Sequence, residues 1–163
     1  MDEAVLKRAA AIEMVVFDVD GVFTDGRFYY GPDDIELKAF HTRDGHGIKR
    51  LHAAGIRTAV ISGRESVAVT RRMRELHVGD IIQNRSDKLP VFEELLARHH
   101  IEAAHCAAVG DDLPDLPLLE AAGFAVAVAD AHPDIRSAAH WVTPTPGGHG
   151  AVRDVADLLL AAR

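Results

Sequence analysis

Two aspartates one residue apart, Asp18 and Asp20, end an apolar run near the start of the chain. The stretch reads EMVVFDVDGVFTDG over residues 13–26, so both carboxylates follow what looks like a buried strand. There, one carboxylate can attack a phosphorus atom and form an aspartyl phosphate, while the other protonates the leaving oxygen and later activates water. Standing alone, such a pair is more often a capped turn than a catalytic pair. The spacing suits a nucleophile with its proton donor, and the other motifs of the chain are what favour that interpretation.

Side chains suited to holding a phosphate or a metal follow other apolar runs or open a helix. They are Ser62, Lys88, Asp111, Asp112 and Asp115. Several carboxylates at one place need a counter-charge, and Mg²⁺ is suited to a site that keeps water and a substrate phosphate. The lysine, the hydroxyl and the metal would hold the phosphate oxygens as charge develops. This set predicts phosphoryl transfer.

The elements that must bring these residues together alternate along the chain. Predicted strands cover residues 13–18, 58–62, 80–83, 105–109 and 124–128, with a weaker candidate at 140–142. Predicted helices cover residues 47–54, 66–76, 87–99, 115–121, 133–139 and 151–162, with Ser86 as the cap of the third. This order predicts an α/β fold with a Rossmann-like, doubly wound, mainly parallel sheet, in which ligands bind at the carboxyl ends of the strands.

One segment interrupts this alternation. Residues 26–40, GRFYYGPDDIELKAF, hold two short strand-like runs around a Gly-Pro-Asp-Asp turn, which predicts an inserted β-hairpin. The chain has no room for a cap domain, so we expect self-association to cover the site, with the hairpin's apolar residues as the contact. Residues 143–163 form a tail and a last helix.

Composition narrows the class of protein. The 163 residues carry a formal net charge of -7 with scattered basic residues, which argues against nucleic acid or a membrane as partner. The single cysteine, Cys106, allows no internal disulfide and suits a core position, and residues 1–12 lack the apolar run of a signal peptide. No run approaches the ~20 apolar residues of a membrane span. We therefore expect one domain over residues 1–163, in the cytoplasm.

The motif order DVDGVFTDG, ISGR, Lys88 and GDDLPD resembles the signature of the haloacid dehalogenase superfamily of phosphohydrolases. The resemblance implies that Asp18 is the nucleophile and Asp20 the general acid/base. It implies that Ser62 and Lys88 bind the phosphate.

The same resemblance implies a Mg²⁺ cofactor. The residues implied to hold the metal are Asp18, Asp20, Asp111, Asp112 and Asp115. Asp111 would be the main carboxylate, and Asp20 would contribute its backbone carbonyl. Asp112 and Asp115 would support Asp111, although an acid at Asp115 is also typical of a helix start.

Within this superfamily the chain resembles the capless, tetrameric phosphatases that act on 3-deoxy-D-manno-octulosonate (KDO) 8-phosphate in lipopolysaccharide precursor synthesis. The stretches LKAFHTRDGHGIK, ISGR, QNRSDKL, GDDLPDLP and GGHGAVRDV carry that resemblance. It implies a homotetramer whose hairpins form a central barrel and whose tail can reach a neighbour's site. The residues implied to bind the sugar-acid phosphate are Thr24, Arg43, Asp44, Gly63, Arg64 and Arg153.

Three alternatives remain open from the sequence. Related phosphatases of nine-carbon, sialic-acid-type 9-phosphates tend to carry Glu-Lys where this chain has Arg64-Glu65, which favours the eight-carbon substrate. A signalling receiver domain also clusters aspartates, but it places its phosphoacceptor on a middle strand. A non-catalytic assembly module would usually have lost one of the catalytic residues.

The glycine-rich segment PTPGGHGA resembles a phosphate-binding loop but lacks the Lys-Ser/Thr of a P-loop. We interpret it either as a flexible lead-in to the last helix or as a segment that covers the substrate.

Overall fold

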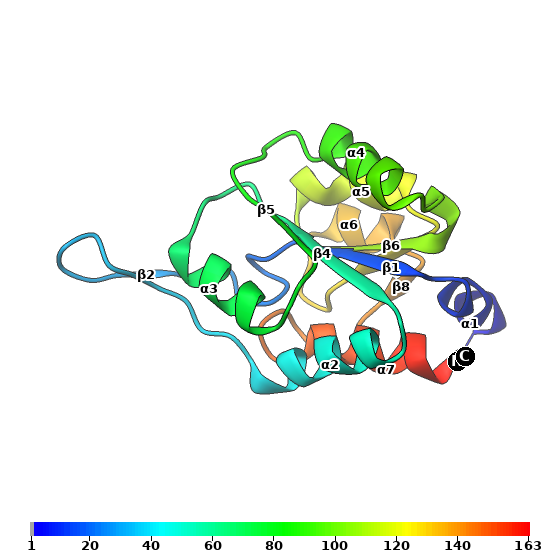
Figure 1. Cartoon of the computed structure of the whole chain (residues 1–163). Coiled ribbons are helices and arrows are strands. Elements are labelled where there is room, and N and C mark those ends of the chain that lie inside the picture. The colour runs from blue at the N-terminus through cyan, green and yellow to red at the C-terminus, as the bar shows by residue number, and fades with distance from the viewer. Residues whose placement is uncertain (1) are drawn as a thin grey trace.

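The computed structural model describes residues 2–163 and is built on a six-stranded sheet whose paired strands all run parallel (Figure 1). The strands are β1 (Met14–Phe17), β4 (Arg57–Ile61), β5 (Asp80–Ile82), β6 (Cys106–Gly110), β7 (Phe124–Ala127) and β8 (Trp141–Val142), in the order β5-β4-β1-β6-β7-β8. The chain leaves β1 toward β5 and then crosses back to β6, so the direction of winding reverses between β1 and β6. The predicted doubly wound sheet is confirmed.

The central strands are buried on both faces because helices cover the sheet above and below. All four residues of β1 are buried, as are all five of β6 and all four of β7. Continuous apolar runs such as MVVF and FAVA are typical of parallel strands of this kind. Cys106, the first residue of β6, lies fully inside the core.

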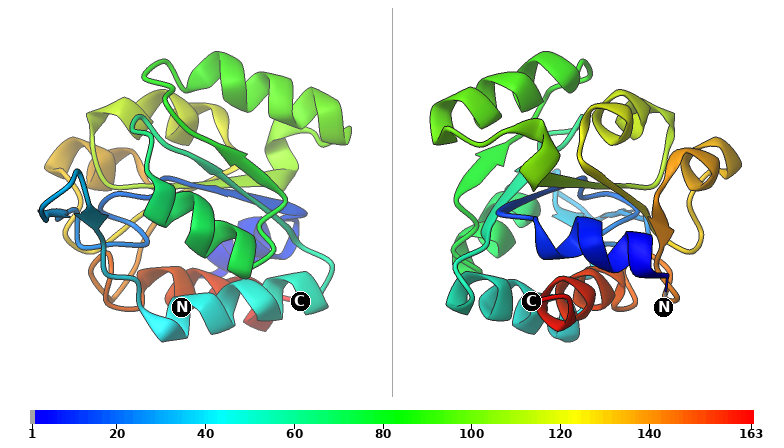
Figure 2. Two further views of the ribbon diagram at one scale, coloured as in Figure 1. Left: turned by 60° about the vertical axis from the view of Figure 1, so that its left-hand side comes forward. Right: turned by 90° about the vertical axis from the view of Figure 1, so that its right-hand side faces the viewer.

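Helices form a layer on each face of the sheet (Figure 2). One layer holds α1 (Glu3–Ala10), α2 (Thr42–Ala53), α3 (Val67–Glu75) and α7 (Ala151–Ala161); the other holds α4 (Leu89–His99), α5 (Leu116–Ala121) and α6 (Pro133–Ala138). Short 3₁₀ turns, η1 (Ala103–His105) and η2 (Leu113–Asp115), flank β6. No helix within residues 2–163 is both long and apolar enough to cross a bilayer.

Two helices depart from the sequence prediction. Helix α1 was not predicted, and α2 begins at Thr42, ahead of the predicted start at residue 47. Gly45 and Gly47 weaken the helical signal of this stretch. Gly47 has a packing role, since a Cβ there would lie 3.2 Å from the Cα of Arg153, so its absence lets α2 approach α7 closely.

The predicted cap of α4 is wrong. Lys88, not Ser86, occupies the N-cap position, and no side chain caps this helix. Pro90 in the first turn has no backbone N–H to satisfy, which reduces the need for a cap. The consequence is that Lys88 sits where the chain enters the helix, with its side chain directed into the core of the site.

The predicted hairpin is present as β2 (Tyr29–Tyr30) paired with β3 (Glu36–Leu37), and it projects from the body of the molecule (Figure 1). The pairing sets Tyr29 opposite Leu37 and Tyr30 opposite Glu36, and opposite residues share a face. Tyr29 and Leu37 are 57% and 59% exposed, so one face of the hairpin presents apolar side chains to solvent. Glu36 lies on the other face.

Candidate active site

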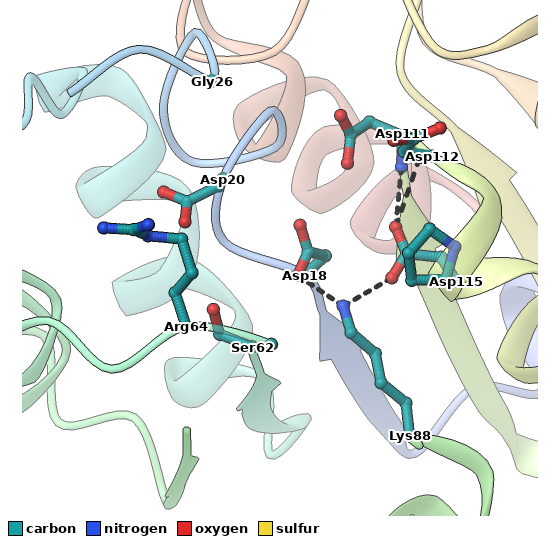
Figure 3. Close-up of a pocket in the computed structure, with 11 residues that line it drawn as sticks. Asp18, Asp20, Gly26, Ser62, Arg64, Lys88, Asp111, Asp112 and Asp115 are labelled. Carbon is teal, nitrogen blue, oxygen red and sulfur yellow. Dashed lines mark hydrogen bonds and ion pairs between the residues drawn. The ribbon is translucent and has the colours of Figure 1, made fainter. Parts of the chain in front are cut away.

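A cavity of about 370 Å³ opens at the carboxyl ends of the strands, where the winding of the sheet reverses (Figure 3). Its lining residues are Asp18, Asp20, Gly26, Ser62, Gly63, Arg64, Lys88, Asp111, Asp112, Pro114 and Asp115. The cavity therefore gathers all four of the sequence motifs, carried by β1, β4, β6 and the start of α4. This is the position at which ligands bind in open parallel sheets.

Lys88 joins two buried carboxylates at the floor of the cavity. Its Nζ atom lies 2.6 Å from Oδ1 of Asp18 and 2.6 Å from Oδ1 of Asp115, and all three residues are buried (Figure 3). Asp18 directly follows β1, and its backbone N–H donates to the carbonyl of Val109 in the neighbouring strand. The nucleophile candidate is thus fixed by the sheet and by one buried ammonium group.

Both carboxylate oxygens of Asp115 accept hydrogen bonds inside the protein. While its Oδ1 accepts from Lys88, its Oδ2 accepts from the backbone N–H groups of Asp111, at 3.0 Å, and Asp112, at 3.4 Å. Asp112 in turn caps η2 by accepting from the N–H of Leu113. These contacts hold the loop after β6 and turn the carboxylate of Asp111 toward the cavity.

Burial and mutual repulsion raise the pKa values of two carboxyl groups in the cavity. Burial, and next the nearby Asp115, raise the pKa of Asp18 to about 7, although Lys88 opposes the shift. Burial and then Asp18, Asp115 and Asp112 raise the pKa of Asp111 to about 8. Burial lowers the pKa of Lys88, but Asp18 and Asp115 outweigh it and leave that pKa above its usual value. One lysine is too little positive charge for this group.

A divalent cation fits the missing charge. Asp18, Asp111 and Asp115 each offer an oxygen, and these three atoms lie within 4.8 Å of one another. Gly21 makes room for this arrangement, because it has a φ of +93° and a Cβ there would lie 2.0 Å from Oδ2 of Asp111. Hard oxygen ligands of this kind suit Mg²⁺. The side chains of Asp20 and Asp112, also predicted as metal residues, lie outside this group.

Ser62, Gly63 and Arg64 form the opposite wall, directly after β4. Ser62 is buried, and its backbone bonds to both sides of the loop, with its N–H donating to Ile82 and its carbonyl accepting from Arg85. Gly63 and Arg64 are exposed at the mouth of the cavity. The structure therefore brings these three predicted residues to the cavity.

Lys38 is a residue of the site that sequence reasoning missed. Its Nζ forms an ion pair with Oδ1 of Asp20, and its side chain is fully buried. By residue type alone, Lys38 resembles a surface lysine of a hairpin. Its spacing from Glu36 was the available signal, since residues two apart on a strand point the same way.

The structure does not bring four predicted substrate residues to the cavity. Thr24 is fully buried, and its hydroxyl accepts from the N–H groups of Gly21 and Gly26, so it braces the loop after β1.

The other three lie around the start of α7. Arg43 and Arg153 line a separate polar cavity of about 380 Å³. Asp44 is buried in the first turn of α2, and its Oδ1 accepts from the N–H of Arg153 at 2.9 Å. Burial, opposed by that hydrogen bond, raises the pKa of Asp44 to about 6.

The glycine-rich segment before α7 packs against the loop that carries the aspartate pair. The N–H of Gly148 donates to the carbonyl of Val22 at 3.0 Å. A Cβ on Gly147 would lie 1.7 Å from the carbonyl oxygen of Gly21, so only glycine fits there. The segment thus supports the loop of the site from behind.

Cys106 has the character of a core residue. It is fully buried, and burial raises the pKa of its thiol to about 12, so the reactive thiolate is absent at neutral pH.

Known proteins resemble this chain over almost all of its length. Residues 75–154 match the model of the haloacid dehalogenase-like hydrolases. The 3-deoxy-D-manno-octulosonate 8-phosphate phosphatase KdsC of Yersinia pestis is 45% identical over 159 residues, which cover 98% of this chain and 85% of that protein.

Solved structures agree with that relationship. The 3-deoxy-D-manno-octulosonate 8-phosphate phosphatase of Moraxella catarrhalis, in complex with magnesium ion, phosphate ion and KDO, superposes with a TM-score of 0.97 at 39% identity, covering 100% of this chain and 94% of that one. The cobalt-bound enzyme of Haemophilus influenzae superposes with a TM-score of 0.92 at 39% identity, covering 95% of this chain and 91% of that one. The chain belongs to the haloacid dehalogenase-like hydrolases, within the family of the 3-deoxy-D-manno-octulosonate 8-phosphate phosphatases.

Proposed function

We propose that this protein is a Mg²⁺-dependent phosphatase that hydrolyses KDO 8-phosphate to KDO and inorganic phosphate, as a step in lipopolysaccharide precursor synthesis. The observation that carries the proposal is the cluster of Asp18, Lys88, Asp111 and Asp115 in one cavity. The names of its relatives supply the substrate, and the magnesium, phosphate and KDO bound to the Moraxella catarrhalis enzyme support both cofactor and ligand.

In the first chemical step, a carboxylate oxygen of Asp18 attacks the phosphorus atom. The bond from phosphorus to the sugar oxygen breaks, and Asp20 in its protonated form gives its proton to that oxygen, which leaves as the sugar alcohol. Lys88 lies against Asp18 and neutralises charge beside the attacking group. Ser62, at the end of β4, is placed to bind a phosphate oxygen.

In the second step, water replaces the sugar. Asp20, now ionised, takes a proton from the water, whose oxygen bonds to phosphorus as the bond to Asp18 breaks. Phosphate leaves, and both aspartates return to their starting states. Asp20 lines the cavity and is half-buried, so it can reach both the leaving oxygen and the water.

Asp18 and Asp111 would hold the Mg²⁺, together with the backbone carbonyl of Asp20, and the ion would supply positive charge for the phosphoryl oxygens. Asp115 would act from behind, because both of its oxygens already accept hydrogen bonds within the protein. Asp112 caps η2 and would support the loop.

For the sugar acid, Gly63 and Arg64 are the proposed contacts within the same chain, since both line the cavity. Arg43 and Arg153 are proposed contacts from a neighbouring subunit, because within one chain they line a different cavity. Asp44 would act indirectly, by fixing the backbone of Arg153. Thr24 would act by shaping the loop after β1.

We also propose that the chain forms a single domain that assembles into a homotetramer in the cytoplasm. One continuous hydrophobic core supports the single domain. Self-association is supported by the exposed apolar residues Tyr29, Ile35 and Leu37 on the projecting hairpin. Monomeric proteins seldom present a contiguous apolar patch to solvent. A lone buried cysteine is compatible with a reducing compartment.

The deciding experiment measures phosphate release with Mg²⁺ from KDO 8-phosphate, a nine-carbon sialic-acid-type 9-phosphate and a simple hexose phosphate. We expect a strong preference for KDO 8-phosphate. Asp18→Asn should abolish phosphate release while keeping the circular dichroism spectrum of the folded protein. Preference for the nine-carbon compound would keep the chemistry and overturn the substrate. No release from any compound would overturn the proposal as a whole.

Self-association is tested separately by light scattering after gel filtration. The wild-type chain should elute as a tetramer, and Leu37→Glu, on the exposed face of the hairpin, should elute as a smaller species. Val142→Glu is the matched control, since Val142 is an exposed apolar residue, at 37%, on the edge strand β8 of the main sheet and not on the hairpin.

A further inference from the structure

We propose that Lys38, at the base of the hairpin, is a positioning residue that holds the side chain of Asp20 in place for proton transfer. The inference rests on the proposed phosphatase function and goes beyond it by assigning a role to a residue outside the four motifs.

The contact between the two residues is direct and buried. The Nζ of Lys38 pairs with Oδ1 of Asp20, and none of the Lys38 side chain is exposed. Lys38 is also absent from the lining of the active-site cavity, whereas Asp20 is part of it. Lys38 therefore acts on the reaction through its contact with Asp20.

Lys38 is itself held by its surroundings. Oε1 of Glu36 lies 3.9 Å from its Nζ and, among residues 2–163, is buried with no hydrogen-bond partner. The other oxygen of Glu36 accepts from Arg64 at 2.8 Å. The ring of Phe28 lies beneath both cations, 5.7 Å from the Nζ of Lys38 and 4.2 Å from the guanidinium carbon of Arg64. The ammonium group thus has little freedom to leave Asp20.

Only one oxygen of Asp20 is occupied by this contact. Oδ1 is bound to Lys38, while Oδ2 accepts no hydrogen bond from any residue in the range 2–163. Lys38 therefore fixes which oxygen faces the substrate. In the first step Oδ2 would give its proton to the sugar oxygen, and in the second it would take one from water.

The position of Lys38 follows from the alternation of side chains along the hairpin. Leu37 points outward, so its neighbours Glu36 and Lys38 point toward the site. The face that contacts the acid/base and the face proposed to contact other subunits are therefore opposite sides of the same two-stranded ribbon.

The test compares two substrates that differ in their need for an acid. The sugar alkoxide of KDO 8-phosphate is a poor leaving group and needs the proton of Asp20, whereas p-nitrophenolate leaves without one. In Lys38→Met, kcat/KM should fall about 10²-fold for KDO 8-phosphate, the lower range of a lost general acid. For p-nitrophenyl phosphate, kcat/KM should stay near the wild-type value. This ratio depends only on the steps up to loss of the first product, and p-nitrophenolate leaves without a proton from Asp20.

A second readout follows the intermediate. Because water activation in the second step also uses Asp20, Lys38→Met should release p-nitrophenol in a rapid burst equal to the enzyme concentration, followed by slow turnover. Lys49→Met is the control; Lys49 is an exposed lysine on α2, and this variant should match the wild-type enzyme on both substrates.

Equal losses on the two substrates would overturn the inference, because they would indicate a general structural role, and so would the absence of any loss. If Lys38→Met does not fold, Lys38→Arg decides in the same assay, with a smaller loss expected on KDO 8-phosphate alone. Failure of the proposed function is distinct, since the wild-type enzyme itself would then release no phosphate.

Discussion

The Nζ of Lys88 lies 2.6 Å from Oδ1 of Asp18, across a separation of 70 residues in the chain. The same nitrogen contacts Asp115 at the same distance, so one cation serves two buried carboxylates. Removing it would leave both without a counter-charge, which is a larger cost than the pair's own net contribution.

Lys88→Met should therefore lower both stability and activity. We expect the free energy of unfolding to fall by about 3–5 kcal/mol, measured by urea denaturation without added metal. Phosphate release should fall by about 10²–10³-fold, as for loss of a group that stabilises charge in the transition state. Full activity in a folded Lys88→Met protein would contradict the role assigned to this lysine.

Gly21→Ala should disturb Asp111 rather than the fold alone. Gly21 has a φ of +93°, and an added methyl group would lie 2.0 Å from Oδ2 of Asp111. Gly55→Ala is the matched control, because Gly55 has a φ of +79° with no atom within 4 Å of the added methyl. Both variants should lose about 1 kcal/mol from backbone strain. Only Gly21→Ala should lose Mg²⁺ binding, measured by calorimetry; equal binding in the two would contradict the prediction.

Mg²⁺ should stabilise the wild-type protein but not Asp111→Asn. A ligand that binds only the folded state at 100 times its Kd adds about 2.7 kcal/mol, which a thermal melt detects as a rise in Tm. Asp112→Asn should keep most of this rise, because its side chain caps η2 outside the metal group. Chelation with EDTA should abolish phosphate release, and added Mg²⁺ should restore it.

Asp44 should make stability fall as pH rises toward neutrality. Its pKa in the folded state is about 6, above the ~3.9 of an unfolded chain, so the folded protein keeps this proton to a higher pH. The free energy of unfolding therefore decreases from about pH 4 to about pH 6 by up to ~1.4 kcal/mol for each unit between the two pKa values. Above pH 6 this contribution is constant.

Asp44→Asn should remove that part of the pH dependence, measured as urea unfolding between pH 4 and pH 7. Glu93→Gln is the control, because Glu93 is an exposed carboxylate on α4. An unchanged slope in Asp44→Asn would contradict the assignment.

Much of the fold was predictable because the buried strands of a parallel sheet appear in the sequence as continuous apolar runs. The strands β1, β4, β6 and β7 lie within about a residue of their predicted limits, since each contains a short continuous run of apolar residues. Helix α2 was placed too late because its glycines weaken the helical pattern, although they serve packing against α7. Propensity is local, and this contact is between distant segments.

The site was predictable where it lies in motifs and was missed where it depends on tertiary contacts. Asp18, Ser62, Lys88 and Asp111 each end a strand or open a helix, so the fold alone brings them together. Lys38 was missed because its partner Asp20 lies outside the hairpin, on the loop after β1. Thr24 lies away from the cavity because its hydroxyl turns inward to brace that loop. The order of residues alone does not show which way the side chains of Lys38 and Thr24 point.

The glycine-rich segment before α7 has a consequence for how the protein is made. The loop that follows Asp18 and Asp20 is closed by Gly147 and Gly148, which come from the far end of the chain. The first catalytic motif to leave the ribosome therefore takes its final shape only after residues 147 and 148 have been synthesised. A nascent chain that stops short of this segment lacks a finished reaction centre.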